Sequence, residues 1–172
     1  MAEALNDWHD FYVLLGGAAA TLVGLTFVAA SIGVGVLSRD HEAGMKVFVT
    51  PTVTHFSAIL IACLLDLAPL ASATSLAALL LAEGVAGIAY SLRVWLHIRS
   101  REFTADLVLV DRVWYALAPV AAYAVLAGGA VALMVGAKPS RAVLAVGLGL
   151  LLFAGIRNAW DMAQWFVMRP RG

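Results

Sequence analysis

The chain has 172 residues, of which 63% are hydrophobic and only 13% are charged, and its mean hydropathy is +0.93. Soluble domains carry about a quarter charged residues and about half apolar residues, so this composition excludes a soluble domain and predicts an integral membrane protein. The 11 Lys and Arg residues balance the 11 Asp and Glu residues. A basic surface of the kind that binds nucleic acid is therefore not expected.

Five apolar runs are long enough to cross the hydrocarbon core of a bilayer, which is roughly 30 Å thick. They are continuous, whereas the strands of a membrane barrel are short and alternate between apolar and polar residues. The first run is too long for the hydrophobic region of a signal peptide, so we expect it to be retained as a span. The sequence predicts an all-α fold in which residues 1–172 form one transmembrane domain. The expected spans are 11–37, 46–68, 74–98, 112–136 and 141–168.

The positions of Lys and Arg predict the orientation of this domain. If the N-terminus lies outside, the outer connections hold only Lys138 and Arg141. The inner connections and span ends then hold eight basic residues, Arg39, Lys46, Arg93, Arg99, Arg101, Arg112, Arg169 and Arg171. Because cytoplasmic loops carry an excess of Lys and Arg, we expect the N-terminus outside and the C-terminus in the cytoplasm. Tyr12 then lies near the outer end of the first span, where aromatic belts form.

Small residues recur along the first span, where Gly17, Gly24 and Ser31 follow one another at intervals of seven. Lipid gives helices no hydrophobic reason to pair, so small residues that allow close backbone approach mark packing faces. Packing within one chain and contact with another copy both remain open. Five spans make a thin bundle in which to enclose a pathway, and we therefore expect a homo-oligomer. Gly84 and Gly87 are expected to pack in the same way in the third span.

Polar residues interrupt three of the spans. His55 and Asp66 in the second span are eleven residues apart, which places them on one helix face to within about 20°. Glu83 and Tyr90 share a face of the third span, with Arg93 to one side. The fifth span carries the sequence GIRNAWDMAQW, whose polar residues are Arg157, Asn158, Asp161 and Gln164. Charged groups in a bilayer are costly and normally face protein, water or a partner, so these residues are the candidate functional set.

Depth, counted at 1.5 Å per residue from the span ends, predicts which of these side chains meet. His55, Glu83 and Arg157 fall near the midplane, while Arg93 and Asp161 fall nearer the inner side. An intramembrane Arg favours a carboxylate partner. We therefore expect one layer that pairs Glu83 with Arg157 and a second that pairs Arg93 with Asp161. An Arg157–Asp161 pair within one helix turn is an alternative, and His55 is a candidate to hydrogen-bond with Glu83.

Three interpretations of this polar set remain open. The ion pairs either only lock the helices together, or form a pathway for protons, ions or a small polar solute, or belong to a membrane enzyme or cofactor site. The sequence contains no HExxH, phosphate-binding loop or GxSxG motif, so an enzyme is not expected. The single cysteine, Cys63, excludes a disulfide within the chain and a cysteine-based metal cage. No metal and no cofactor are expected, because His55 and His97 lie several helix turns apart in depth.

The leading functional prediction is a channel or transport component for protons, ions or a small polar solute. In it Glu83 and His55 are the titrating pair, Arg157 tunes or gates them, and Asp66 lines the outer mouth. The alternative is a non-transporting scaffold or regulatory partner of another membrane protein, in which the buried ion pairs are structural. The Ala-, Gly-, Leu- and Val-rich composition resembles that of small bacterial inner-membrane proteins, so we expect a location in that membrane.

Overall fold

The computed structural model describes residues 2–34, 42–69, 72–100, 114 and 117–168, of which residues 2–7, 32–34, 42–49, 97–100, 162 and 165–168 are described by their backbone alone. All of the regular structure in these residues is helical. It comprises α1 (Ala2–Val34), α2 (Glu42–Leu67), α3 (Ala73–Ser100), α5 (Ala118–Met134) and α6 (Ser140–Met168). The predicted all-helical fold is confirmed for this part of the chain.

Four of these helices, α1, α2, α3 and α6, are long and apolar enough to cross a membrane. The described part of the predicted fourth span is the shorter helix α5. Of the eight basic residues expected on the inner side, only Arg93 has a described side chain, and the other seven lie outside the described residues or side chains. The orientation therefore stays a prediction.

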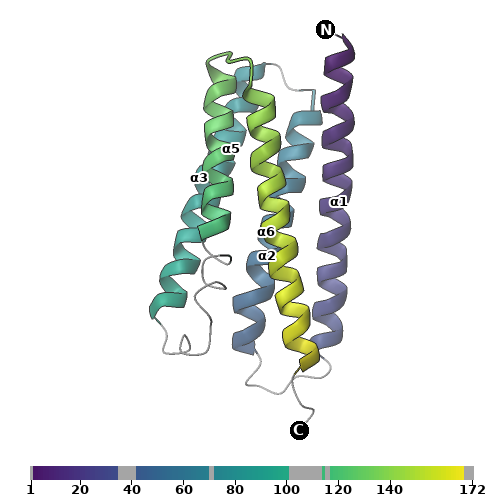
Figure 1. The fold of residues 1–172 in the computed structure, drawn as a ribbon, viewed down its shortest axis with the longest axis vertical. Helices are drawn as coiled ribbons and strands as arrows, with labels where there is room; N and C mark the ends of the chain where they lie inside the picture. Colours follow the sequence, from purple (N-terminus) through teal and green to yellow (C-terminus); the bar gives the residue numbers. More distant parts are fainter. Residues whose placement is uncertain (1, 35–41, 70–71, 101–113, 115–116, 169–172) are drawn as a thin grey trace.

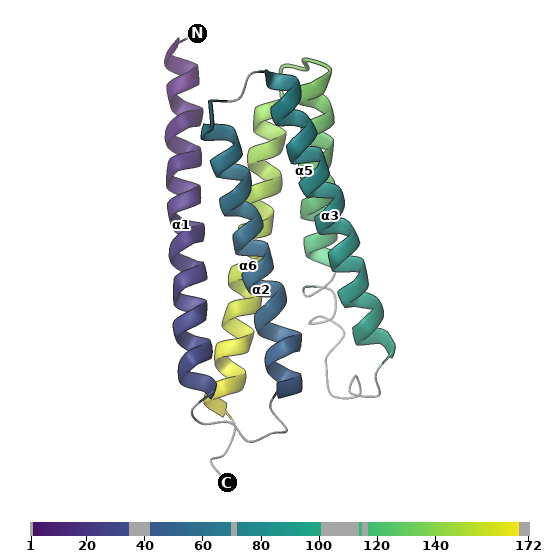
Figure 2. The same ribbon diagram turned by 180° about the vertical axis from the view of Figure 1, so that it is seen from behind.

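The helices run alternately up and down, with the N-terminus at one end of the bundle and the C-terminus at the other (Figure 1). Helices α2, α3, α5 and α6 form a four-helix bundle in which α2 packs against α3 and α6, and α5 also packs against α3 and α6. Helices α3 and α6 lie diagonally opposite each other, as do α2 and α5. Helix α1 lies outside this bundle and packs mainly along α2 (Figure 2).

Two turns show how the sequence ends and restarts the helices. At the N-terminus of α3, the Ser72 hydroxyl accepts a hydrogen bond from the Ser75 backbone N–H at 3.1 Å, which caps that helix. At the C-terminus of α5, Gly136 has a φ of +72° and Ala137 N–H donates to the Ala132 carbonyl at 2.8 Å. This is a Schellman cap, which favours glycine at the residue with positive φ. The spans predicted at 112–136 and 141–168 leave only a short connection, and this turn brings α5 and α6 side by side.

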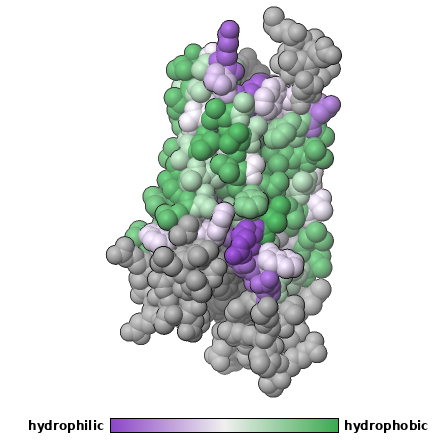
Figure 3. Space-filling model, viewed as in Figure 1, coloured by the Kyte–Doolittle hydropathy of each residue, from purple (hydrophilic) through white to green (hydrophobic). Residues whose placement is uncertain are grey.

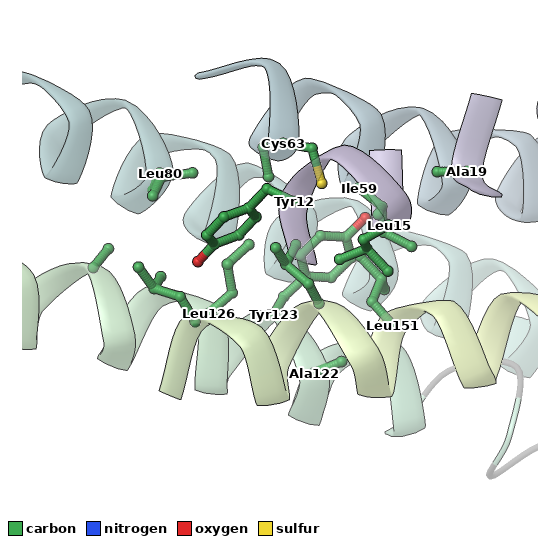
Figure 4. Packing of buried hydrophobic residues seen from close by; sticks show 14 of the residues in the cluster. Tyr12, Leu15, Ala19, Ile59, Cys63, Leu80, Ala122, Tyr123, Leu126 and Leu151 are labelled. Atoms are coloured by element: carbon green, nitrogen blue, oxygen red, sulfur yellow. The ribbon is translucent and has the colours of Figure 1, made fainter. Parts of the chain in front are cut away.

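The outer surface is apolar around the middle of the bundle, where large side chains such as Leu14, Leu25 and Phe153 are exposed (Figure 3). An apolar belt of this kind is the surface that a lipid environment requires, whereas soluble monomers expose smaller apolar patches. The core is built from Tyr12, Phe56, Ile59, Tyr123, Leu126, Leu148 and neighbouring apolar residues (Figure 4). Charged and polar side chains that enter this core are therefore exceptional.

The small residues of α1 do not pack inside the chain as expected. A Cβ atom added at Gly17 or Gly24 meets no atom within 4 Å, and Ser31 is exposed, with its hydroxyl donating to the Phe27 carbonyl of the same helix. The α1–α2 contact uses Gly16 instead, where an added Cβ would lie 3.1 Å from Cys63 Cβ. Intrachain packing through Gly17, Gly24 and Ser31 is therefore wrong, and their contact with another copy stays a prediction.

Candidate functional site in the interior of the bundle

The centre of the bundle holds a hydrogen bond between a histidine and a tyrosine. His55 Nδ1 on α2 lies 3.1 Å from the Tyr123 hydroxyl oxygen on α5, and both residues are only 1% exposed. The bond joins the two helices that lie diagonally opposite each other. The ring of Tyr90 on α3 stands edge-on to the His55 ring, with centroids 6.3 Å apart. Three polar aromatic side chains from three helices therefore meet at one level of the core.

Glycine 87 on α3 makes room for this arrangement. A Cβ atom added at Gly87 would lie 2.3 Å from the Tyr123 ring, closer than real Cβ contacts. One turn earlier, a Cβ added at Gly84 would lie 3.0 Å from Ala127 Cβ on α5. The expected packing role of Gly84 and Gly87 is confirmed, because both let α5 approach α3 closely. The absence of a side chain at residue 87 is what allows the Tyr123 ring to reach toward His55.

Glu83 lies one turn before Gly87 on the same face of α3, within electrostatic range of the Tyr123 hydroxyl. Both of its carboxylate oxygens are buried, and neither has a hydrogen-bond partner among the described residues. The expected Glu83–Arg157 pair is therefore wrong, since α3 and α6 occupy opposite corners of the bundle. The expected hydrogen bond between His55 and Glu83 is wrong as well, because His55 Nδ1 bonds to Tyr123 instead.

The charged residues of α6 pair within their own helix. Arg157 forms an ion pair with Asp161 one turn away, which confirms the alternative pairing. Arg93 is exposed on α3, so the expected Arg93–Asp161 layer is wrong. Gln164 is also exposed, and a hydrophilic patch covers the surface of α6 toward its C-terminal half (Figure 3). Arg157 and Asp161 are partly exposed at this end of the bundle, and they do not form an interior layer with α3.

Asn158 differs from its charged neighbours because it turns into the core. It is 0% exposed, and neither its amide oxygen nor its amide nitrogen has a hydrogen-bond partner among the described residues. It follows Gly155 by three residues on α6, and an added Cβ at Gly155 would lie 2.6 Å from Phe56 on α2. Asn158 therefore faces α2 about one turn closer to the C-terminal end of the bundle than Phe56. Buried amides without protein partners normally bind water or a ligand.

The opposite end of the bundle, where the N-terminus lies, carries a second ion pair. Arg141 Nη1 on α6 donates to both carboxylate oxygens of Asp66 on α2, at 3.2 Å each. The Asp66 side chain is 6% exposed and the Arg141 side chain 34%, so the arginine partly covers the carboxylate. Asp66 was expected at the outer mouth. The structure places it at the end of the bundle where the N-terminus lies, and the assignment of this end to the outer side stays a prediction. The arginine partner of Asp66 is an addition that the sequence did not indicate.

Tyr12 on α1 reaches into the core beneath this ion pair. Its side chain is 1% exposed and its hydroxyl has no hydrogen-bond partner among the described residues. Figure 4 shows the hydroxyl pointing toward Leu80 on α3 and Leu126 on α5. A place in an aromatic belt at the membrane interface is therefore wrong for Tyr12. Asp66 and Arg141 both lie within electrostatic range of this hydroxyl.

These groups follow one another along the length of the bundle. Asp66 and Arg141 lie within electrostatic range of the Tyr12 hydroxyl, which points toward Leu80 on α3. Glu83 follows Leu80 by three residues on the same helix. Cys63 lies within electrostatic range of both Asp66 and Glu83, so the two carboxylates flank one short stretch of α2. Glu83 in turn lies within electrostatic range of Tyr123, which hydrogen-bonds with His55. We call the series Asp66, Tyr12, Glu83, Tyr123, His55 and Asn158 the interior polar series.

Tyr123 and Tyr12 were missed by sequence reasoning, as was the role of Arg141. For Tyr123 a signal was present, because a tyrosine in the middle of the predicted span 112–136 lies far from both interfaces. For Tyr12 the position near a span end indicated the opposite environment. For Arg141 the sequence gave no information on which helix lies beside it.

Among the residues that the structure describes, no group of three or more His, Cys, Asp and Glu side chains is placed to hold a metal ion. The interior polar series consists of carboxyl, hydroxyl, imidazole and amide groups. No protein-family model matches the sequence, and neither a curated protein nor a solved structure matches it.

Proposed function

We propose that this chain is a membrane transport component that moves protons along the interior polar series. The observation that carries the proposal is Glu83, a carboxylate in the core of an apolar bundle whose two oxygens have no protein partner. An ionised carboxylate is costly in such surroundings, and protonation removes that cost. A group of this kind is suited to take up and release a proton. Other ions or a small polar solute are the alternatives within the same class.

The neighbours of Glu83 support protons over larger cargo. The Tyr123 hydroxyl and the His55 imidazole each carry a hydrogen-bond donor and an acceptor, so each can accept a proton on one side while releasing one on the other. They are in direct hydrogen bond, with no space between them for a hydrated ion. The orphaned amide of Asn158 continues the series toward the C-terminal end. In this proposal the bundle lies in a bacterial inner membrane with the N-terminus outside, and Arg157 and Asp161 lie near the inner side.

Reconstitution into liposomes tests the proposal. With a pH-sensitive dye inside, the wild-type protein is expected to dissipate a pH gradient between pH 5 and 8, and Glu83→Gln is expected to abolish that flux. Gln has the same shape but cannot release a proton. Asp10→Asn is the matched control, because Asp10 is an exposed carboxylate on α1. Wild-type liposomes without proton flux at any pH in this range contradict the proposal, as does unchanged flux in Glu83→Gln.

A second candidate is a scaffold that docks against another membrane protein or another copy of itself. The open stripe of Gly17, Gly24 and Ser31 on α1 favours it, since no residue of the described chain fills that face. Gly17→Leu together with Gly24→Leu separates the two functions. A scaffold loses assembly in this variant, measured by crosslinking in membranes. A transport component that works as a single bundle keeps its proton flux.

A further inference from the structure

We infer that Asp66, Arg141 and Tyr12 form the outer entrance of the pathway, in which Arg141 closes access to Asp66 and the Tyr12 hydroxyl passes protons on to Glu83. This inference rests on the proposed function and adds two residues, Arg141 and Tyr12, to it. Three helices build the entrance, because Asp66 comes from α2, Arg141 from α6 and Tyr12 from α1.

The first step is the cover over Asp66. Its side chain is 6% exposed, whereas Arg141, which donates to both carboxylate oxygens, is 34% exposed. The guanidinium therefore lies between the carboxylate and the solution at this end of the bundle. The pair also ties the last turn of α2 to the first turn of α6, so movement of Arg141 away from Asp66 uncovers the carboxylate and frees the two helix ends at once.

The second step is the hydroxyl beneath the pair. Tyr12 is almost completely buried and its hydroxyl has no partner among the described residues. A tyrosine hydroxyl that served packing alone gains nothing from such a position, because a buried polar group without a partner is destabilising. A hydroxyl accepts a proton on its lone pair and releases its own proton to the next group, so Tyr12 is neutral before and after each transfer.

The third step concerns α1. This helix packs on the outside of the four-helix bundle, and its candidate span is the least buried of the four long helices. Tyr12 is nevertheless among the most deeply buried large side chains of the chain. The neighbouring Trp8 and Phe11 rings pack edge to face at 5.9 Å, and the Phe11 and Tyr12 rings at 5.3 Å, which orients the tyrosine inward. Helix α1 thus contributes a pathway residue to a bundle that is otherwise complete without it. His9, one turn earlier and exposed, also lies within electrostatic range of Asp66.

Cys63 is a natural probe of this entrance. It is the single cysteine of the chain, it is 1% exposed, and it lies within electrostatic range of Asp66 and Glu83. A small cationic methanethiosulfonate reagent added outside vesicles of defined orientation is expected to label Cys63 slowly in the wild type. In Arg141→Ala the rate is expected to rise about fivefold or more, the factor that loss of one ion pair permits.

Two controls accompany the labelling experiment. Lys138→Ala removes an exposed cation at the same end of the bundle and is expected to leave the rate unchanged. Arg141→Lys keeps the positive charge and is expected to restore most of the slow labelling. Equal rates in Arg141→Ala, Lys138→Ala and the wild type overturn the role of Arg141 as a cover. Circular dichroism and size-exclusion chromatography establish that each variant is folded.

Tyr12→Phe tests the relay, because it removes the hydroxyl and keeps the ring. If Tyr12 has only a structural role, Tyr12→Phe removes a hydroxyl without a partner. The variant is then as stable as the wild type or more stable, and its proton flux is unchanged. The relay predicts proton flux lower by about tenfold or more in liposomes, in a protein at least as stable as the wild type. Thr21→Val is the matched control, since Thr21 is an exposed hydroxyl residue on α1 whose hydroxyl donates to the Gly17 carbonyl.

The outcomes separate the entrance from the proposed function. Flux that Glu83→Gln abolishes but Tyr12→Phe leaves unchanged overturns the relay and supports the pathway. A wild-type protein without flux contradicts the proposed function. In that case faster Cys63 labelling in Arg141→Ala still supports an entrance that Arg141 covers, and equal labelling overturns it.

Discussion

Polar side chains in the centre of the bundle have different partners from those at its two ends. At the ends, carboxylates meet arginines, in the Asp66–Arg141 pair between two helices and the Arg157–Asp161 pair within one. In the centre, Glu83 has no hydrogen-bond partner among the residues that the structure describes, and His55 bonds to a tyrosine. Compensated charges serve to hold helices together, whereas uncompensated polar groups in a core cost stability. The difference supports the proposal that the centre has a role beyond holding the helices together.

The largest expected effect comes from filling the space beside Tyr123. Gly87→Ala places a Cβ within 2.3 Å of the Tyr123 ring, so the ring must move and its bond to His55 is lost. We expect a loss of about 1–3 kcal/mol in the free energy of unfolding. The measurement is thermal or denaturant unfolding in detergent micelles.

Gly128→Ala is the control for that substitution. Gly128 lies on α5 with no atom within 4 Å of an added Cβ. Alanine there is expected to be neutral or to stabilise by up to about 1 kcal/mol, because glycine is a poor helix former. If both variants have the same stability, the close packing of the centre does not contribute to the fold, and the comparison between centre and ends loses its basis.

Sequence reasoning determined the helices and their polar faces well, but it did not determine which helices are neighbours. Continuous apolar runs predicted both ends of α2, α3 and α6 to within a few residues, whereas α1 begins well before the predicted residue 11. The order of helices around the bundle depends instead on close approaches such as Gly147 against Leu126, where an added Cβ would lie 2.8 Å from the Leu126 backbone nitrogen. Hydropathy and periodicity contain no information on such pairings.

This is why the ion pairs predicted between helices failed, whereas the alternative pair within one helix is present. An arginine and a carboxylate at equal depth were assumed to face each other, which requires α3 and α6 to be neighbours. Helices α3 and α6 lie diagonally opposite each other in the bundle, and Arg157 pairs instead with Asp161 one turn away on α6. Local pairs at i and i+4 are visible in a sequence, whereas pairs between helices are not. The missed residues Tyr12, Tyr123 and Arg141 all make their contacts between helices.

A smaller effect is expected from replacing the partnerless amide in the core. Asn158→Leu removes two polar atoms without hydrogen-bond partners and keeps a similar volume. We expect the free energy of unfolding to rise by about 1–2 kcal/mol, while proton flux in liposomes falls. Ile156→Leu, on the exposed side of α6, is expected to change neither quantity. A destabilised Asn158→Leu protein contradicts the assignment, since it means that the amide has structural partners.

The smallest expected effect separates the two ends from each other. Asp66→Asn breaks a pair that joins α2 to α6 and whose carboxylate is 6% exposed, so we expect a loss of about 1 kcal/mol. Asp161→Asn breaks a pair within α6 whose carboxylate is 19% exposed, and we expect a loss of about 0.3–0.5 kcal/mol. Unfolding in detergent at low and high salt measures both, and screening reduces the Asp161 effect more because water reaches it more easily. A double-mutant cycle with Arg141 isolates the pair energy at Asp66. If the two losses are equal, the Asp66–Arg141 pair contributes no more than a local helix contact, and its position over the Tyr12 hydroxyl is then the remaining reason for an arginine at residue 141.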